Sequence, residues 1–240
     1  MKNLVISFVT LLFIGFQHQQ VIAQTSTFVG NEGTLRFFEL YDSEGKPIKT
    51  ASEMGVNGSP MLLEGWASGV VHYKNGVVFA DTAMNYSLFD NQLFYVRDHR
   101  MFKIVLPVAS FYLSYMDKGE AVNYHFKSGY PAVDGHDSAS LYEVLYEGDN
   151  LQLVQWSHKK VKESFGYGSG HEKSFAPEKI LYVYIPKENT MTELRPAIAA
   201  IKKRLPAYAD IINEYCVKNK INIKDEEQVT ALFAYLDKKQ

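Results

Sequence analysis

Hydrophobic and polar residues alternate along the middle of the chain, as they do in strands that bury one face. Turn residues separate the alternating segments. The pair Asn75-Gly76 is a strong hairpin signal, because both residues tolerate positive φ. A further hairpin, 141–160, turns at Gly148-Asp149. The pattern predicts an antiparallel β-meander whose strands lie at 34–42, 66–73, 77–89, 92–97, 101–107, 109–115, in the two arms of 141–160, and at 179–186, where Pro186 ends the last one.

The hydrophobic period becomes helical from Thr190 onward. One apolar stripe runs from Leu194 to Leu205, a second helix starts at Pro206, and Asp225 caps a third. Short helices of this kind need an apolar surface to pack on, and the sheet offers one. The sequence therefore predicts an α+β fold, in which a curved antiparallel β-meander sheet is followed by a C-terminal three-helix segment packed on it.

The N-terminus carries the three parts of a secretory signal peptide. A short positive start is followed by an apolar run of about 13 residues, and Val21-Ile22-Ala23 supplies small residues for cleavage. The run is shorter than the roughly 20 residues that a membrane-spanning helix needs, so we expect a periplasmic or secreted protein that does not span the membrane. The alternative, a buried N-terminal helix, fits these parts less well. The expected organisation is a signal peptide (1–23), an N-terminal strand and polar connection (24–57), an antiparallel β domain (58–188) and the helical segment (189–240).

Composition narrows the chemistry. The single cysteine, Cys216, excludes an internal disulfide and a cysteine-rich zinc site, and it falls on the apolar stripe of the second predicted helix. Basic residues form no dense cluster with interleaved aromatic residues, which argues against nucleic-acid binding. Aromatic residues are abundant, at 14% of the chain, as is common on sheet surfaces. We expect no cofactor.

Two glycine-containing segments gather the residues that could carry chemistry. Segment 129–140 holds Asp134, His136 and Asp137, and segment 165–177 holds His171 and Glu172. A histidine with two carboxylates could bind a divalent metal, and serine with histidine and aspartate could attack an acyl group. No H-E-x-x-H, G-x-S-x-G or phosphate-loop motif accompanies them. We interpret both segments as solvated loops, with ligand binding through these five residues as the second reading and catalysis as the third.

Several stretches together resemble one family. The entry "GSP…W…G" from Gly58, the strand pair "NYSLFDNQLFYV", the hairpin "LYEVLYEGDNLQLVQW" and the closing segment "IKKRLPAYADIINEYCVKNKINIKDEEQVTALFAYLD" are similar to a family of uncharacterised exported proteins of Bacteroidetes-type Gram-negative bacteria. The resemblance covers most of residues 55–238. It implies an envelope location, a β-rich body and a helical tail, and it transfers no functional residue. Segments 129–140 and 165–177 are longer here than in that family.

Two classes of function are compatible with these features. The first is an exported cell-envelope protein that binds a protein partner or a small apolar ligand without catalysis, on an aromatic sheet face or beneath the helices. The alternative is a hydrolase or metal-dependent enzyme that uses segments 129–140 and 165–177. Because glycine-rich loops hold catalytic geometry poorly, the sequence favours the first class.

The signal peptide gives a direct prediction. Because small residues occupy the positions before the expected cleavage site, the mature protein should begin at Gln24. Mass spectrometry of the protein purified from its native host measures this. A mature chain that retains Met1 would contradict export.

Overall fold

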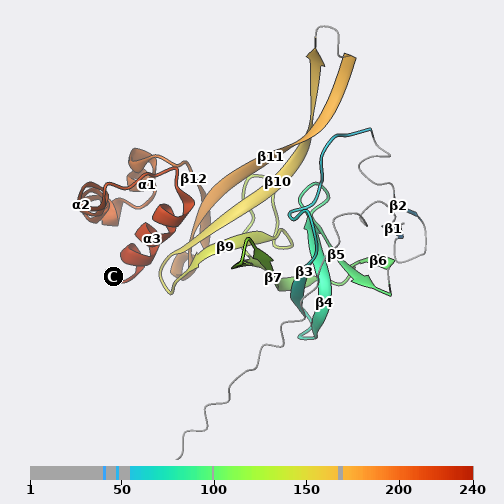
Figure 1. The fold of residues 1–240 in the computed structure, drawn as a ribbon. Helices are drawn as coiled ribbons and strands as arrows, with labels where there is room; N and C mark the ends of the chain where they lie inside the picture. The colour runs from blue at the N-terminus through green and yellow to red at the C-terminus, as the bar shows by residue number, and fades with distance from the viewer. Residues whose placement is uncertain (1–39, 42–46, 49–54, 99, 167–169, 240) are drawn as a thin grey trace, which may run out of the picture. The chain divides into compact units, whose positions relative to one another are not determined.

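The structure is a computed structural model, and it describes residues 40–41, 47–48, 55–98, 100–166 and 170–239 (Figure 1). The expected signal peptide and most of the expected strand 34–42 lie outside these residues. The strands are β1 (Leu40–Tyr41), β2 (Pro47–Ile48), β3 (Ala67–Tyr73), β4 (Val78–Ser87), β5 (Gln92–Arg97), β6 (Arg100–Lys103), β7 (Val108–Asp117), β8 (Glu120–Lys127), β9 (Tyr142–Glu147), β10 (Gln152–Gly166), β11 (Gly170–Ile185) and β12 (Thr190–Leu194). The helices are α1 (Ile198–Arg204), α2 (Ala209–Asn219) and α3 (Glu226–Asp237), with short 3-10 turns at Pro186–Glu188 and Pro206–Tyr208.

Within the described residues the strands form one sheet, in the order β12-β11-β10-β9-β8-β7-β3-β4-β5-β6-β1-β2. All strand pairs are antiparallel except β1 with β6. The chain leaves the meander order twice. The first pair, β1 and β2, lies beyond β6 and is not next to β3, and β7 pairs with β3 and not with β6. The α+β class, with a mainly antiparallel sheet followed by three helices, is confirmed. We also expected curvature, but the described sheet is open and uncurled.

The hairpin of β10 and β11 is the longest element, and it corrects the expectation of a loop at 165–177. The two strands stay in register from Gln152↔Tyr184 to Gly166↔Gly170, so residues 170–177 belong to β11. Opposite charges face each other in the outer part, where Glu163 contacts both His171 and Lys173, and such cross-strand pairs stabilise a sheet. Pro177 has no amide hydrogen, but β11 tolerates it at this position. Its partner Lys159 directs its own amide away from β11, to the carbonyl of Leu88, so no ladder hydrogen bond is lost between the two residues.

The start of the helical region also differs from the expectation. Residues 190–194 form β12, which pairs with Ile185 to Leu181 of β11, and α1 begins only at Ile198. Thr190 and Thr192 are β-branched and favour a strand, and Leu194 is followed by Arg195, which precedes Pro196 and is therefore disfavoured in a helix. Strand β8 was not predicted from the sequence. It follows β7 through a two-residue turn, Lys118 and Gly119, in which both residues have positive φ.

The buried side chains form three hydrophobic clusters. The largest joins one face of β10–β12 to the helices and includes Leu153, Val183 and Leu194 from the sheet and Ile201, Ile212, Leu232 and Phe233 from the helices. A second cluster fills β3, β4, β5, β7 and β8 around Tyr86, Phe111 and Phe126. The third lies on the opposite face of β9–β12 and contains Tyr130, Tyr142, Val154, Tyr182 and Met191.

The helical segment is tied to the sheet by polar contacts as well as by the first cluster. The carboxylate of Asp237, at the end of α3, accepts hydrogen bonds from the amides of Asn150 (2.9 Å) and Leu151 (2.7 Å) in the β9–β10 turn. A side chain at Gly148 would collide with this carboxylate, which explains a glycine at that turn. At its other end α3 begins at the predicted cap, where the Asp225 carboxylate accepts a hydrogen bond from the amide of Gln228 (3.2 Å).

Of the helices that the structure describes, none has the length and apolar character needed to cross a membrane.

Core packing of the helices gives a second prediction. Ile212 of α2 and Leu232 of α3 are fully buried in the cluster that joins the helices to the sheet. Ile212→Ala and Leu232→Ala should each lower the free energy of unfolding by about 2–5 kcal/mol, because each leaves a cavity. Val217→Ala is the matched control on α2, since Val217 is 79% exposed, and it should change stability little. Urea denaturation measures all three, and equal midpoints would show that the helices do not stabilise the fold.

Candidate functional site

The segment 129–140 folds back over one face of the sheet. Its tip is a tight turn in which Asp134 and Gly135 both have positive φ, and Val133 and His136 pair across it. The ammonium group of Lys74 donates to the carbonyl of Ser138 (3.0 Å), which ties the segment to the end of β3. Most residues of the segment are exposed, as expected for a solvated loop, but Tyr130 is buried against Tyr142 of β9 and Tyr184 of β11.

Three of the five candidate site residues predicted from the sequence, Asp134, His136 and Asp137, lie in this segment. The Nδ1 atom of His136 lies 2.8 Å from the hydroxyl of Tyr142, and its ring packs on Trp156 at 4.3 Å between centroids. Burial lowers the pKa of His136, so its imidazole is neutral near pH 7. The carboxylate of Asp134 accepts a hydrogen bond from the hydroxyl of Tyr182, whose pKa is raised mainly by burial. Asp137 accepts from the amide of Ala139 (2.8 Å) and so stabilises the turn.

The other two residues, His171 and Glu172, lie in the outer part of β11. The Nε2 atom of His171 lies 2.8 Å from the carboxylate of Glu163, and its ring stacks on Phe165. His136 packs on Trp156, which pairs with Ile180, and His171 precedes Ile180 by nine residues of extended chain. The two histidines are therefore about 30 Å apart along the strand. Among the described residues, no three of the histidine, cysteine and acidic side chains lie close enough to hold a metal ion.

A row of polar side chains that the sequence pattern does not indicate crosses the helix-facing side of the sheet. Glu143, Gln155 and Ser157 are at least nine-tenths buried there. The Gln155 Nε2 group donates to Glu143 (3.2 Å). Burial and, to a smaller extent, the charge of Glu226 raise the pKa of Glu143 to about 7. One signal in the sequence could have indicated this polar row. Glu143 is an acidic residue on the same strand face as the apolar residues Leu141 and Leu145.

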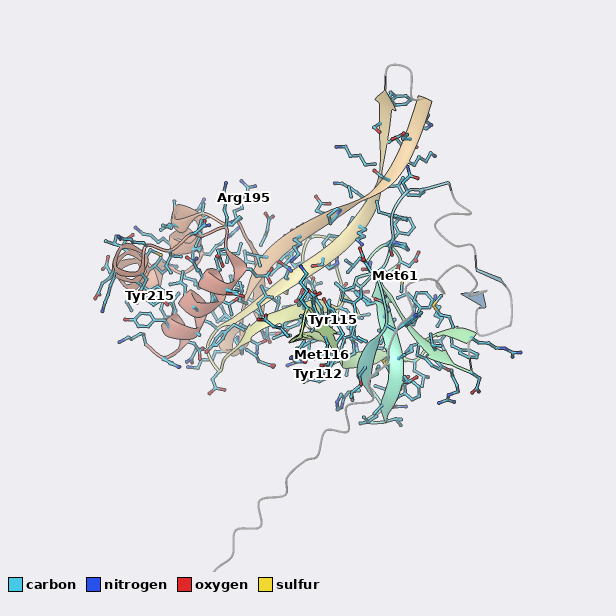
Figure 2. All side chains as sticks on the ribbon, viewed as in Figure 1. Met61, Tyr112, Tyr115, Met116, Arg195 and Tyr215 are labelled. Carbon is cyan, nitrogen blue, oxygen red and sulfur yellow. The ribbon has the colours of Figure 1, made fainter. Side chains whose placement is uncertain are left out.

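A cleft of about 390 Å³ opens between this side of the sheet and α3. Its floor is mainly apolar and includes Leu181, Leu194, Ile223 and Val229. Charged groups stand at the rim, where Lys179 of β11 pairs with Glu226 of α3 (3.2 Å). Arg195, labelled in Figure 2, extends from the end of β12 and contacts Glu193 (3.7 Å). Lys224 and Gln155 complete the polar lining.

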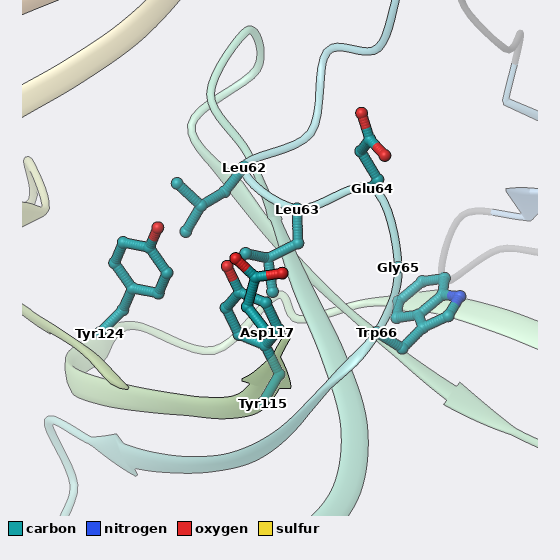
Figure 3. Close-up of a pocket in the computed structure, with 8 residues that line it drawn as sticks. All are labelled: Leu62, Leu63, Glu64, Gly65, Trp66, Tyr115, Asp117 and Tyr124. Atoms are coloured by element: carbon teal, nitrogen blue, oxygen red, sulfur yellow. The ribbon is translucent and has the colours of Figure 1, made fainter. Parts of the chain in front are cut away.

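A second pocket, of about 350 Å³, lies where segment 62–66 faces β7 and β8. It is lined by Leu62, Leu63, Glu64, Gly65, Trp66, Tyr115, Asp117 and Tyr124 (Figure 3). Burial raises the pKa of Tyr124 to about 12, with smaller contributions from Tyr115, Glu143 and Glu226. Since Glu226 also lines the cleft beside α3, the two pockets are neighbours on the same side of the sheet.

The opposite side of β3, β7 and β8 carries exposed aromatic residues, as the abundance of tyrosine suggested. Tyr112 of β7 is 44% exposed, stacks on His125 at 4.2 Å between centroids and meets the edge of His72 at 6.1 Å. Met116, four residues further along β7, is also exposed (Figure 2). This row is small and open, and the described pockets lie on the other side of the sheet.

Comparison of the chain with protein families, with curated proteins and with solved structures gives no match. The resemblance to exported Bacteroidetes-type proteins accordingly stays a prediction. The function must be inferred from the residues of this chain.

The buried carboxyl of Glu143 gives a third prediction. Because its pKa rises from 4.5 to about 7 on folding, the folded chain binds this proton more tightly than the unfolded chain. Its contribution to stability is full below pH 4.5 and is lost as the pH rises through 7, by on the order of 3 kcal/mol. Glu143→Gln should remove this loss, so the fall in stability from pH 5 to pH 8 should be smaller in the variant than in the wild type. Glu120→Gln, at an exposed position of β8, is the control, and urea titrations at both pH values should show the wild-type pH dependence for it. The same pH dependence in Glu143→Gln would contradict the prediction.

Proposed function

We propose that this is an exported cell-envelope protein that binds a small ligand with an apolar body, without catalysis, in the cleft between the sheet and α3. The observation that carries the proposal is the cleft itself, with an apolar floor and charged groups at its rim. Its volume of about 390 Å³ falls at the lower end of the range that is typical for sites of small ligands.

The composition of the cleft indicates which ligand features would be recognised. Leu181, Leu194 and Ile223 offer apolar contacts to a body of a few carbon rings or a short chain. Lys179, Arg195 and Lys224 outnumber Glu193 and Glu226 at the rim, which favours an anionic or polar end group near the opening. Export is supported by the three-part N-terminus.

The arrangement of the other candidate residues favours binding over the alternative of a hydrolase or metal-dependent enzyme. His136 is engaged with Tyr142 and Trp156, and His171 is engaged with Glu163. The two segments that would have to form one active site lie at separate parts of β10–β11. Ser140 contacts Asp137 rather than a histidine, so the described residues of this segment form no serine–histidine pair.

A fluorescent probe tests the proposal. 1-Anilinonaphthalene-8-sulfonate has apolar rings for the floor and a sulfonate for the basic rim. Ile223→Trp should fill the cleft and weaken probe binding at least about tenfold, because the ring would occupy the apolar floor. Val217→Trp is the control, since Val217 is exposed on α2 and does not line the cleft, and its affinity should equal that of the wild type.

Native mass spectrometry of the protein purified from its host should also show a bound small molecule in the wild type that Ile223→Trp lacks. Equal probe affinity in wild type and Ile223→Trp, with equal melting temperatures, would overturn the cleft as the binding site.

A further inference from the structure

The pocket at segment 62–66 is held in place by a buried asparagine. The side chain of Asn85, 3% exposed, donates from Nδ2 to the carbonyls of Leu63 (2.9 Å) and Gly65 (2.7 Å) and accepts from the amide of Leu63 (3.2 Å). The amide of Leu62 donates to the carbonyl of Tyr86 (2.7 Å). Segment 62–66 is thus fixed to β4 by four hydrogen bonds, and the residues that it presents are preorganised.

The lining of this pocket combines aromatic rings with acidic groups. Trp66 stands on one side and Tyr124 on the other, with Tyr115 and Asp117 between them and Glu64 above (Figure 3). Of the eight described residues that line it, none is a lysine or an arginine. The negative faces of aromatic rings attract a cation, and carboxylates add a longer-range attraction of the same sign.

Neighbouring charges strengthen this preference. Glu143 and Glu226 lie close enough to Tyr124 to raise the pKa of its hydroxyl, in addition to the larger effect of burial. The ammonium group of Lys159 donates to the carbonyls of Ser59 (3.0 Å) and Met61 (2.6 Å), and it also lies close enough to Glu64 for their charges to interact. The residues that line the pocket carry two carboxylates and no basic side chain, which disfavours an anionic ligand.

We propose that the pocket formed by segment 62–66 with Tyr115, Asp117 and Tyr124 is a binding site for a small organic cation, an alkylammonium or quaternary ammonium ion. The volume of about 350 Å³ admits a small molecule and is too small for a folded partner. The rings contact the alkyl groups around the nitrogen, and Glu64 and Asp117 balance its charge. This site is separate from the cleft beside α3 and does not depend on the function proposed for that cleft.

The chain offers a built-in reporter. It contains two tryptophans, Trp66 and Trp156, so Trp156→Phe leaves Trp66 as the only one. Trp156 packs in the cluster on the opposite face of the sheet and does not line the pocket. Choline, added as the probe to this variant, should change the fluorescence of Trp66 saturably. The neutral isostere 3,3-dimethylbutan-1-ol has nearly the same shape without the charge, and it should bind at least about tenfold more weakly.

Substitutions separate charge from shape. Asp117→Asn and Glu64→Gln should each weaken choline binding about threefold to tenfold, and the double variant more. Glu120→Gln, in the same β7–β8 hairpin but outside the pocket, should leave the affinity unchanged. Ile223→Trp should also leave it unchanged, which distinguishes failure of this proposal from failure of the cleft.

Calorimetry with the otherwise unaltered protein repeats the comparison of choline with its isostere, so the test does not rely on the folding of Trp156→Phe. A smaller heat in Trp66→Leu, with unchanged binding of 1-anilinonaphthalene-8-sulfonate, is expected for this site. Equal affinity for choline and the neutral isostere would overturn the proposal, as would no saturable response to choline, or a response that Asp117→Asn and Glu64→Gln leave unchanged.

Discussion

The antiparallel pairing of β10 with β11 is the constraint on which the rest of the structure depends. Alternate residues of these strands supply both faces, so that Leu153 and Val183 enter the cluster with the helices while Val154 and Tyr182 enter the cluster under segment 129–140. The hairpin also contacts residues 57–61. Asn57 forms a bridge with Ser174 of β11, and the ammonium group of Lys159 in β10 donates to the carbonyls of Ser59 and Met61. A shift of one residue in this register would exchange the two faces and disrupt every one of these contacts.

The same alternation leaves a polar row between two apolar blocks. On the helix-facing side, the cluster with the helices and the cluster around Tyr86 are separated by Glu143, Gln155 and Ser157. Apolar packing is interrupted there, and a pocket lies on each side of the row, one beside α3 and one at segment 62–66. The charges of the two pockets differ, since basic residues outnumber acidic ones at the first, and the two charged residues that line the second, Glu64 and Asp117, are acidic. The two sites are therefore expected to select different ligands.

Local signals were sufficient where neighbouring residues alone decide the conformation. Asn75-Gly76 and Gly148-Asp149 indicated their turns, Asp225 its cap, and the stripe Val229, Leu232, Phe233 and Leu236 the buried side of α3. The sequence failed where a partner strand decides. Residues 170–177 contain glycine, proline and several charges, and they become a strand because Glu163 and Lys159 lie opposite them in β10. Thr190–Leu194 extends the sheet because the edge of β11 is available to it.

The sequence by itself determined the class of fold, because the periods of two and of 3.6 residues are local properties of the chain. It also determined the buried stripe of α3. Only the tertiary structure decided which polar residues meet. Asp134 and His136 were brought to tyrosines of β9 and β11, and His171 was placed about 30 Å away. Glu64 and Asp117, far apart in the sequence, were brought into the lining of one pocket. Such contacts depend on strand order and register. These are set by packing between residues that are far apart in the sequence, so the residue at any single position does not indicate them.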